Sequence, residues 1–328
     1  THEHFLIDFM TVLTVPDGAG ERKYMHEPLS MDNLWWVRYN WTSNMDNLQL
    51  FDEQLAIEEA SHYFNNGGST IVDVTSVGIG RDPEALVRIS RSTGLNIVMG
   101  SGYYVDSTHS DKLRRMPVSK IADQIILDVK KGVGVNNVRA GLIGEIGCSW
   151  PWTESEKKVL EAAVAAQKAT GAPLLIHPGR NQIAPIEILN SVSKLGGDIT
   201  RTVMGHIERT IYDRNLLKDV LDTGAYVNLD LFGHDESHYP LDTSSNMPAD
   251  HERIAQIEFM IDEGGSNQIL MSHDVCSKHR LKKYGGHGYD HIITRIVPRM
   301  LAKGISQEDI SKILIDNPTT MLTFKRNV

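Results

Sequence analysis

Short apolar segments alternate with longer amphipathic segments along almost the whole chain, and this alternation constrains the fold more than any other feature. Apolar and β-branched runs predict strands at 69–76, 95–104, 139–147, 172–178, 199–207, 225–232 and 268–274. Periodic patterns predict helices at about 53–66, 83–92, 119–132, 154–169, 184–195, 213–223, 250–263, 290–303 and 306–316. Strands that alternate with helices in this way run parallel in one sheet.

An eighth strand is expected at the start of the chain, which reads Thr-His-Glu-His over residues 1–4. Too few residues precede His2 to form a whole strand, so we expect this strand to be truncated here and to begin upstream. No G-x-G-x-x-G motif follows an early strand, which argues against an open dinucleotide-binding sheet. The sequence predicts an α/β fold, a single (β/α)8 TIM barrel over residues 1–328. Long loops at 16–51 and 233–249 are expected to shape access to its mouth.

The composition narrows the class of partner. The net charge is −9 and no long basic stripe occurs, so nucleic acid and anionic membrane surfaces are not expected as partners. No apolar run is long enough to span a bilayer. The chain has 2 cysteines, Cys148 and Cys276, which form no disulfide framework and predict a reducing, cytoplasmic location. We interpret both as packing residues, and a small molecule as the partner.

Six residues with metal-ligand side chains stand at the ends of predicted strands. His2 and His4 alternate along the first strand, so both imidazoles point to the same side. Each of the other four follows an apolar run, at the end of a barrel strand where enzymes of this fold carry their catalytic residues. These four are Glu145, His177, His206 and Asp274. A lone histidine at such a place is usually a structural polar residue, but six together predict a binuclear metal centre.

The ligand types indicate the chemistry. Two divalent ions held by four histidines and Asp274 need an anionic bridge, which Glu145 can provide with its two oxygens. A hydroxide shared between the ions is a nucleophile at neutral pH. Asp274 is also placed to carry a proton to the leaving group. Nitrogen and oxygen ligands suit zinc, and also manganese, iron or cobalt.

The chain resembles the phosphotriesterase family of the amidohydrolase superfamily, in particular its phosphotriesterase-related branch. The resemblance runs through THEH (1–4), NGG (66–68), STH (107–109), GLIGEIGCSWP (141–151), LLIHPGR (174–180), VMGHIERT (203–210), DLFG (230–233) and KYGGHGYDHI (283–292). It implies that His2, His4 and Asp274 bind the more buried ion and that His177 and His206 bind the more exposed one. Phosphotriesterases and related lactonases bridge their ions with a carboxylated lysine, and this chain has Glu145 there, as the branch does.

The resemblance also implies an activity: hydrolysis of N-acetyltaurine, and of other N-acetyl amino acids, to the free amine and acetate. A homodimer is a further expectation. The anionic end of such a substrate needs a cation, for which Arg209 is the first choice. Arg180, Lys278, His279 and Arg280 are weaker candidates, and Tyr103 is expected to donate a hydrogen bond to the substrate. The other candidates come from loops that follow predicted ligands, whereas Tyr103 lies at the end of the strand predicted at 95–104.

Other functions remain open at the level of the sequence. The same centre would serve an esterase, a lactonase or a phosphotriesterase, because one hydroxide attacks carbonyl and phosphorus centres alike. A metal-binding protein without turnover is the alternative from another class. His273, His287 and His291 are not predicted as ligands, because strand alternation turns His273 away from Asp274 and the other two lie in or just after a glycine-rich turn.

Overall fold

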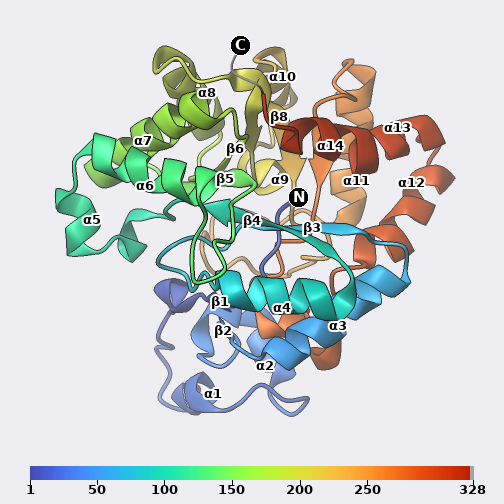
Figure 1. Ribbon diagram of the computed structural model, residues 1–328. Coiled ribbons are helices and arrows are strands. Elements are labelled where there is room, and N and C mark those ends of the chain that lie inside the picture. The colour runs from blue at the N-terminus through green and yellow to red at the C-terminus, as the bar shows by residue number, and fades with distance from the viewer. Residues whose placement is uncertain (326–328) are drawn as a thin grey trace.

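Seven parallel strands form the centre of the protein in a computed structural model that describes residues 1–325 (Figure 1). Each strand pairs with the next one along the chain, in the order β3-β4-β5-β6-β7-β8-β9. The seven strands are β3 (Thr70–Asp73), β4 (Asn96–Ser101), β5 (Leu142–Cys148), β6 (Leu174–Pro178), β7 (Thr202–Met204), β8 (Tyr226–Leu229) and β9 (Ile269–Met271). All seven lie where the sequence predicts them.

The start of the chain takes the eighth strand position and closes the barrel. Glu3 forms a parallel bridge with Asp73, through hydrogen bonds of 3.0 Å from its N–H to Val72 and from the Val74 N–H to its carbonyl. On the other side the Asp274 N–H donates to the His2 carbonyl at 3.2 Å. Residues 1–4 therefore lie in the seam between β3 and β9, and the predicted barrel is confirmed.

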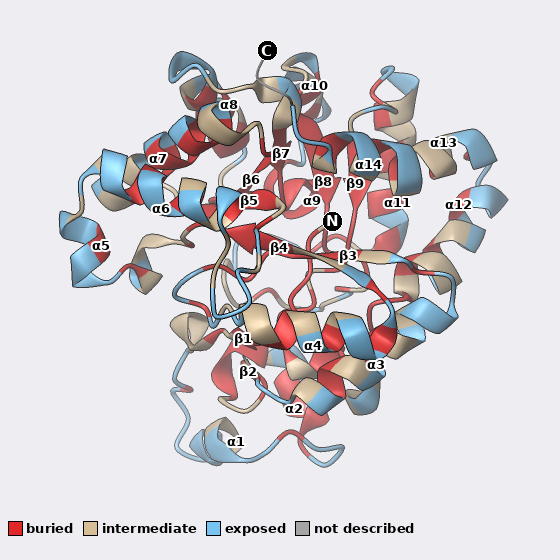
Figure 2. Ribbon diagram, viewed as in Figure 1, coloured by how far each residue is buried: buried red, intermediate tan, exposed pale blue. Residues whose placement is uncertain are grey.

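Helices surround the barrel and bury one face each against it (Figure 2). They are α3 (Glu53–Asn65), α4 (Pro83–Thr93), α5 (Asp111–Arg115), α6 (Val118–Lys130), α7 (Glu154–Thr170), α8 (Ala184–Lys194), α9 (Ile207–Thr210), α10 (Arg214–Asp222), α11 (Asp250–Asp262), α12 (Val297–Ala302), α13 (Gln307–Ser311) and α14 (Asn317–Leu322). Helix α7 shows how local sequence fixes the ends of a helix. Thr153 and Glu156 form a capping box at its start, and Gly171 ends it with φ 72°.

Some predicted boundaries are wrong. The strand predicted at 199–207 is shorter, because residues Ile199–Arg201 form a 3-10 turn before β7 and α9 begins at Ile207. The helix predicted at 290–303 begins as a π-helical turn, Ile292–Ile296, and continues as α12. The helix predicted at 306–316 likewise ends in a π-helical turn, Lys312–Asp316.

The long insertion has a structure of its own. It contains α1 (Arg22–His26) and α2 (Leu34–Tyr39), and the antiparallel pair β1 (Ile7–Asp8) and β2 (Gln49–Leu50) frames it. Figure 1 shows these elements as one blue layer beside the barrel. Within residues 1–325 no helix combines the length and the apolar character needed to cross a bilayer.

Candidate metal centre

The structure brings all six predicted ligands together at one end of the barrel. Glu145 and His177 lie within β5 and β6, His206 follows β7, Asp274 follows β9, and His2 and His4 come from the seam. Three overlapping groups of ligand atoms have all members within 4.8 Å of one another: His2, His4 and Asp274; Glu145, His177 and His206; and His2, His206 and Asp230. The parallel strands explain this convergence, because their carboxyl ends meet at one rim.

Glu145 lies between the first two groups. In the first group, Asp274 Oδ1 is 3.2 Å from His4 Nε2 and 3.7 Å from His2 Nε2. In the second, His177 Nδ1 is 2.9 Å from Glu145 Oε2 and 2.7 Å from His206 Nε2. The other oxygen, Glu145 Oε1, is 3.5 Å from His4 Nε2. One carboxylate thus presents an oxygen to each group.

The Nδ1 atoms of His2, His4 and His206 contact side chains other than the six predicted ligands. The carboxylate of Asp230, directly after β8, lies 2.6 Å from His206 Nδ1 and 3.1 Å from His2 Nδ1. Thr75 Oγ1 is 2.9 Å from His4 Nδ1. These contacts leave the Nε2 atoms of the three histidines pointing into the centre. We therefore interpret Asp230 as the group that orients two ligands rather than as a ligand, a common arrangement in metal sites.

The electrostatics favour a cation at this place. Burial alone would raise the pKa of Glu145, but His2 and His177 hold it well below its usual range. Burial, together with His206, lowers the pKa of His177 to about 3, so this ring is neutral and able to bind a metal. At His2 burial opposes protonation, yet Asp230 and Glu145 outweigh it and raise the pKa well above 6.5. The buried carboxylates thus attract positive charge, which a metal ion supplies.

Unusual backbone geometry marks two ligands. His206 and Asp274 have φ values of 51° and 49°, in the left-handed region that few residues other than glycine adopt. Such conformations collect at functional sites because the surrounding structure holds them. Gly205 before His206 leaves little room for a side chain, since a Cβ there would lie 3.0 Å from Asp230 Oδ2 and 3.2 Å from the Ile176 carbonyl.

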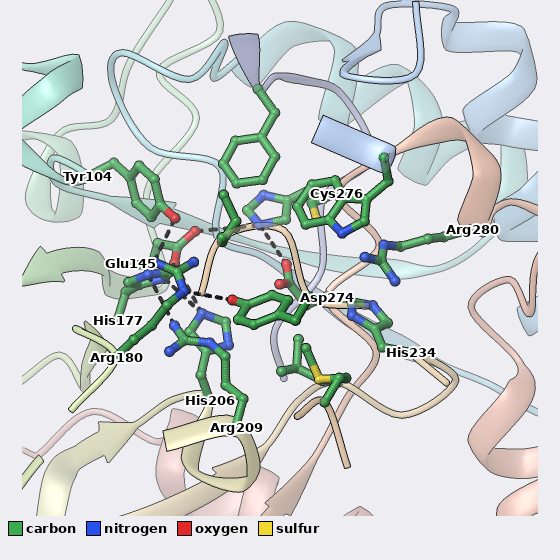
Figure 3. A pocket seen from close by; sticks show the side chains of 17 residues that line it. Tyr104, Glu145, His177, Arg180, His206, Arg209, His234, Asp274, Cys276 and Arg280 are labelled. Atoms are coloured by element: carbon green, nitrogen blue, oxygen red, sulfur yellow. Dashed lines mark hydrogen bonds and ion pairs between the residues drawn. The ribbon is translucent and has the colours of Figure 1, made fainter. Parts of the chain in front are cut away.

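A cavity opens above the ligands, and cationic side chains line it (Figure 3). Arg209 is 4% exposed, and its Nη2 lies 3.3 Å from His177 Nε2 and 3.2 Å from the Pro178 carbonyl. Arg180 Nε donates to Tyr239 Oη at 2.7 Å. Arg280 also lines the cavity but pairs with Glu236 at 2.6 Å. Arg180 and Arg209 have no carboxylate partner among the described residues.

Three predicted substrate contacts are not in the cavity. Tyr103 donates to Gln124 at 2.5 Å and is absent from the cavity wall, where Tyr104 lies instead, 3.4 Å from His177 Nε2. Lys278 pairs with Asp46 at 2.6 Å, and His279 contacts Asn47 at 3.0 Å. Both side chains thus bind the insertion instead of facing the metal centre.

The histidines and cysteines that were not predicted as ligands lie outside the groups of ligand atoms found in residues 1–325. His273 turns away from the centre and contacts Glu3 at 2.7 Å. Cys148 and Cys276 are buried, free, and outside every group of ligand atoms in residues 1–325. Cys276 does line the cavity. Tyr104 and Asp230 were not predicted from the sequence, although Asp230 lies near the carboxyl end of a predicted strand, as the predicted ligands do.

Comparison with known proteins gives the family. The chain is 46% identical to a phosphotriesterase-related protein of Nematostella vectensis, covering 99% of this chain and 94% of the relative. It is 45% identical to the N-acetyltaurine hydrolase of Salmo salar, over 99% and 93%. Among solved structures, a resiniferatoxin-binding protein from Rhodobacter sphaeroides superposes with a TM-score of 0.94 at 34% identity, over 98% and 89%. The family model described as "Phosphotriesterase family" matches residues 1–322, and the chain belongs to that family.

Proposed function

We propose that this protein is a metal-dependent amidohydrolase that cleaves N-acetyltaurine to taurine and acetate, with other N-acetyl amino acids as further substrates. The observation that carries the proposal is the pair Arg180 and Arg209, which lie beside the ligand cluster without a carboxylate partner among residues 1–325. Buried cations of this kind require an anion. Relatives at 44–45% identity bear the name N-acetyltaurine hydrolase, and the sulfonate of that substrate is such an anion.

The six ligands fit two divalent ions, with zinc as the expected metal. His2, His4 and Asp274 would hold one ion, His177 and His206 the other, and Glu145 would bridge them. When bound, the ions would supply an activated water nucleophile and a Lewis acid for the amide carbonyl. The buried Nε2 of His2 supports this assignment, since it has no hydrogen-bond partner within the described chain.

The side chains around the ligands divide the remaining work. Asp274 lies where it can accept the proton of the attacking water and return it to the amine nitrogen, which leaves as taurine. Tyr104, whose hydroxyl is buried beside His177, can donate a hydrogen bond to the acyl oxygen. Burial raises the pKa of Tyr104 well above 10, so this hydroxyl keeps its proton at neutral pH.

Substrate binding requires the cavity to open. Its free volume is about 30 Å³, far below the roughly 300–1,000 Å³ of typical ligand pockets. Tyr239, Leu241 and Met247 in the wall belong to the loop at 233–249, which fits the predicted role of that loop in access. We infer that the sulfonate replaces the Tyr239 hydroxyl as the partner of Arg180 when this loop moves.

A substrate pair tests the proposal. Zinc-loaded protein should release taurine from N-acetyltaurine, and the Arg209→Gln variant should lose about 2–4 kcal/mol in kcat/KM, a factor of roughly 30 to 1,000. N-ethylacetamide, which lacks only the sulfonate, serves as the matched substrate, and its smaller kcat/KM should change little in the variant.

Three outcomes would contradict the proposal or the role of Arg209 in it. Loaded protein that leaves N-acetyltaurine intact but hydrolyses a lactone, an ester or a phosphotriester would assign the centre to that reaction instead. Metal binding without turnover of any of these would make it a silent binding protein. Equal losses on both amides would show that Arg209 supports the fold and not the anion.

A further inference from the structure

A second and larger cleft adjoins the metal cavity. Its volume is about 880 Å³, within the roughly 300–1,000 Å³ range of ligand pockets. His234 and Arg280 line both the cleft and the metal cavity. Figure 3 shows these two side chains on the opposite side of the cavity from Arg180 and Arg209. The cleft therefore begins behind the wall that His234 and Arg280 form.

Positive charge predominates in this cleft. Its lining includes four arginines and two carboxylates: Arg38, Arg280, Arg295, Arg299, Asp235 and Glu236. Both carboxylates are already engaged. Glu236 pairs with Arg280 at 2.6 Å and accepts a hydrogen bond from Trp41 at 3.2 Å. Asp235 accepts the Asp250 N–H at 3.0 Å and lies 3.5 Å from Arg253.

Three guanidinium groups are thus left without a carboxylate partner in the part of the chain that the structure describes. Within that part, Arg38 donates only to the Gly285 carbonyl, at 2.8 Å. Arg295 and Arg299 are exposed, and neither guanidinium forms a hydrogen bond or ion pair with any residue between 1 and 325. The two stand four positions apart on one continuous helical segment, Ile292–Ala302, and both face the cleft. Like charges at this spacing repel each other, and an anion between them removes that cost.

A buried histidine at the back of the cleft adds a polar atom without a partner. His234 is 2% exposed, and its Nε2 makes no hydrogen bond within the described residues. Burial and the nearby Arg280 lower the pKa of His234 well below 6.5, so the ring is neutral. A neutral imidazole with a free nitrogen can donate one hydrogen bond to a ligand.

We propose that this cleft binds a small molecule carrying a phosphate group, held by Arg38, Arg295 and Arg299. A single carboxylate has too few acceptor oxygens and too little charge for three guanidinium groups. A phosphate dianion offers them several acceptor oxygens and up to two negative charges. The site is distinct from the metal centre and does not depend on the reaction proposed above. The volume of the cleft leaves room for a nucleoside attached to the phosphate.

Calorimetric titration of the zinc-loaded protein with inorganic phosphate and with adenosine 5′-monophosphate tests this site. The double variant Arg295→Gln/Arg299→Gln removes two exposed charges and should weaken binding of both probes at least tenfold. The control is Arg91→Gln/Arg115→Gln, two exposed arginines on α4 and α5 with the same change of net charge, and it should bind as the unaltered protein does. Phosphate bound at the metals contributes equally to all three proteins.

The two probes separate the sources of the phosphate group. Equal affinities would show that the cleft recognises the phosphate alone, and tighter binding of the nucleotide would show that the cleft also accommodates the nucleoside. Binding that is unchanged in the Arg295/Arg299 variant would overturn the proposal. So would the absence of binding of either probe up to about 10 mM, a concentration tenfold above a Kd of roughly 1 mM. An equal loss in the control variant would also overturn it, because the effect would then come from net charge alone.

Discussion

Replacement of Asp230 by asparagine should loosen both metal sites at once. Asp230 contacts Nδ1 of His2, which belongs to one group of ligands, and Nδ1 of His206, which belongs to the other. Asparagine keeps the size of the side chain but removes its charge, and its amide nitrogen cannot accept a hydrogen bond from an imidazole N–H. One of the two rings therefore loses its support, and the other keeps only a neutral hydrogen bond.

The expected magnitude follows from these contacts. Loss of a group that orients a metal-bound histidine typically costs 10- to 100-fold in metal affinity, or about 1.4–2.8 kcal/mol. Because the two histidines serve different ions, we expect a loss in this range at each site in Asp230→Asn. Thr75→Val is the matched comparison, since Thr75 supports His4 alone and should weaken only one site.

Competition with a chelator, followed by elemental analysis of the protein, measures both affinities. We expect a weaker metal affinity at both sites in Asp230→Asn and at one site in Thr75→Val. If Asp230→Asn retains both ions as tightly as the unaltered protein, the carboxylate does not orient the ligands. If Thr75→Val loses both ions, the two sites are not supported separately and the comparison fails.

Three more predictions concern buried carboxylates. Glu145→Gln should lower the occupancy of both sites and slow hydrolysis by roughly two orders of magnitude or more, and elemental analysis showing full occupancy would exclude the bridging role. Asp274→Asn should reduce kcat strongly with little change in KM, and a near-normal rate on N-acetyltaurine would exclude the proton transfer. Burial, together with the nearby Asp230, raises the pKa of Glu208 from 4.5 to about 8. The protonated Glu208 therefore contributes its whole share to the free energy of unfolding below pH 4.5, and this share is lost as the pH rises toward 8. Glu208→Gln should remove this loss, so thermal unfolding of the variant and the unaltered protein should differ most near pH 8, and a constant difference across this range would refute the shifted pKa.

The convergence of the six candidate ligands could be predicted from the sequence because a barrel imposes it. Once the strands at 139–147, 172–178, 199–207 and 268–274 are parallel neighbours in one closed sheet, residues at their carboxyl ends must meet. Asp230 lies near the carboxyl end of the strand predicted at 225–232, directly after the observed β8, and the same rule applies to it. It was missed because a carboxylate that supports other ligands carries no spacing signal of its own.

The side chains that line the cavity were harder to predict because their positions depend on loops. Gly102, with φ 147°, interrupts the strand geometry before Tyr103 and Tyr104, so alternation cannot tell which tyrosine faces the cavity. Lys278 and His279 follow Asp274 closely, but their side chains are held by Asp46 and Asn47 in the insertion. Contacts between two loops more than 200 residues apart leave no local pattern in the sequence.

The seam at residues 1–4 links metal binding to the closure of the barrel. His2 and His4 face the ligand cluster. Glu3 between them accepts hydrogen bonds from the N–H groups of His273 and Val275, on either side of Asp274, at 2.8 and 3.1 Å. Detachment of this one segment would open the sheet and remove two ligands in the same event. By thermodynamic linkage, each metal ion that binds the closed state alone stabilises it by about 2.7 kcal/mol when its free concentration is 100 times Kd. Chelation should therefore destabilise the whole barrel, and amide exchange should rise first along residues 1–4 and their neighbours in β3 and β9.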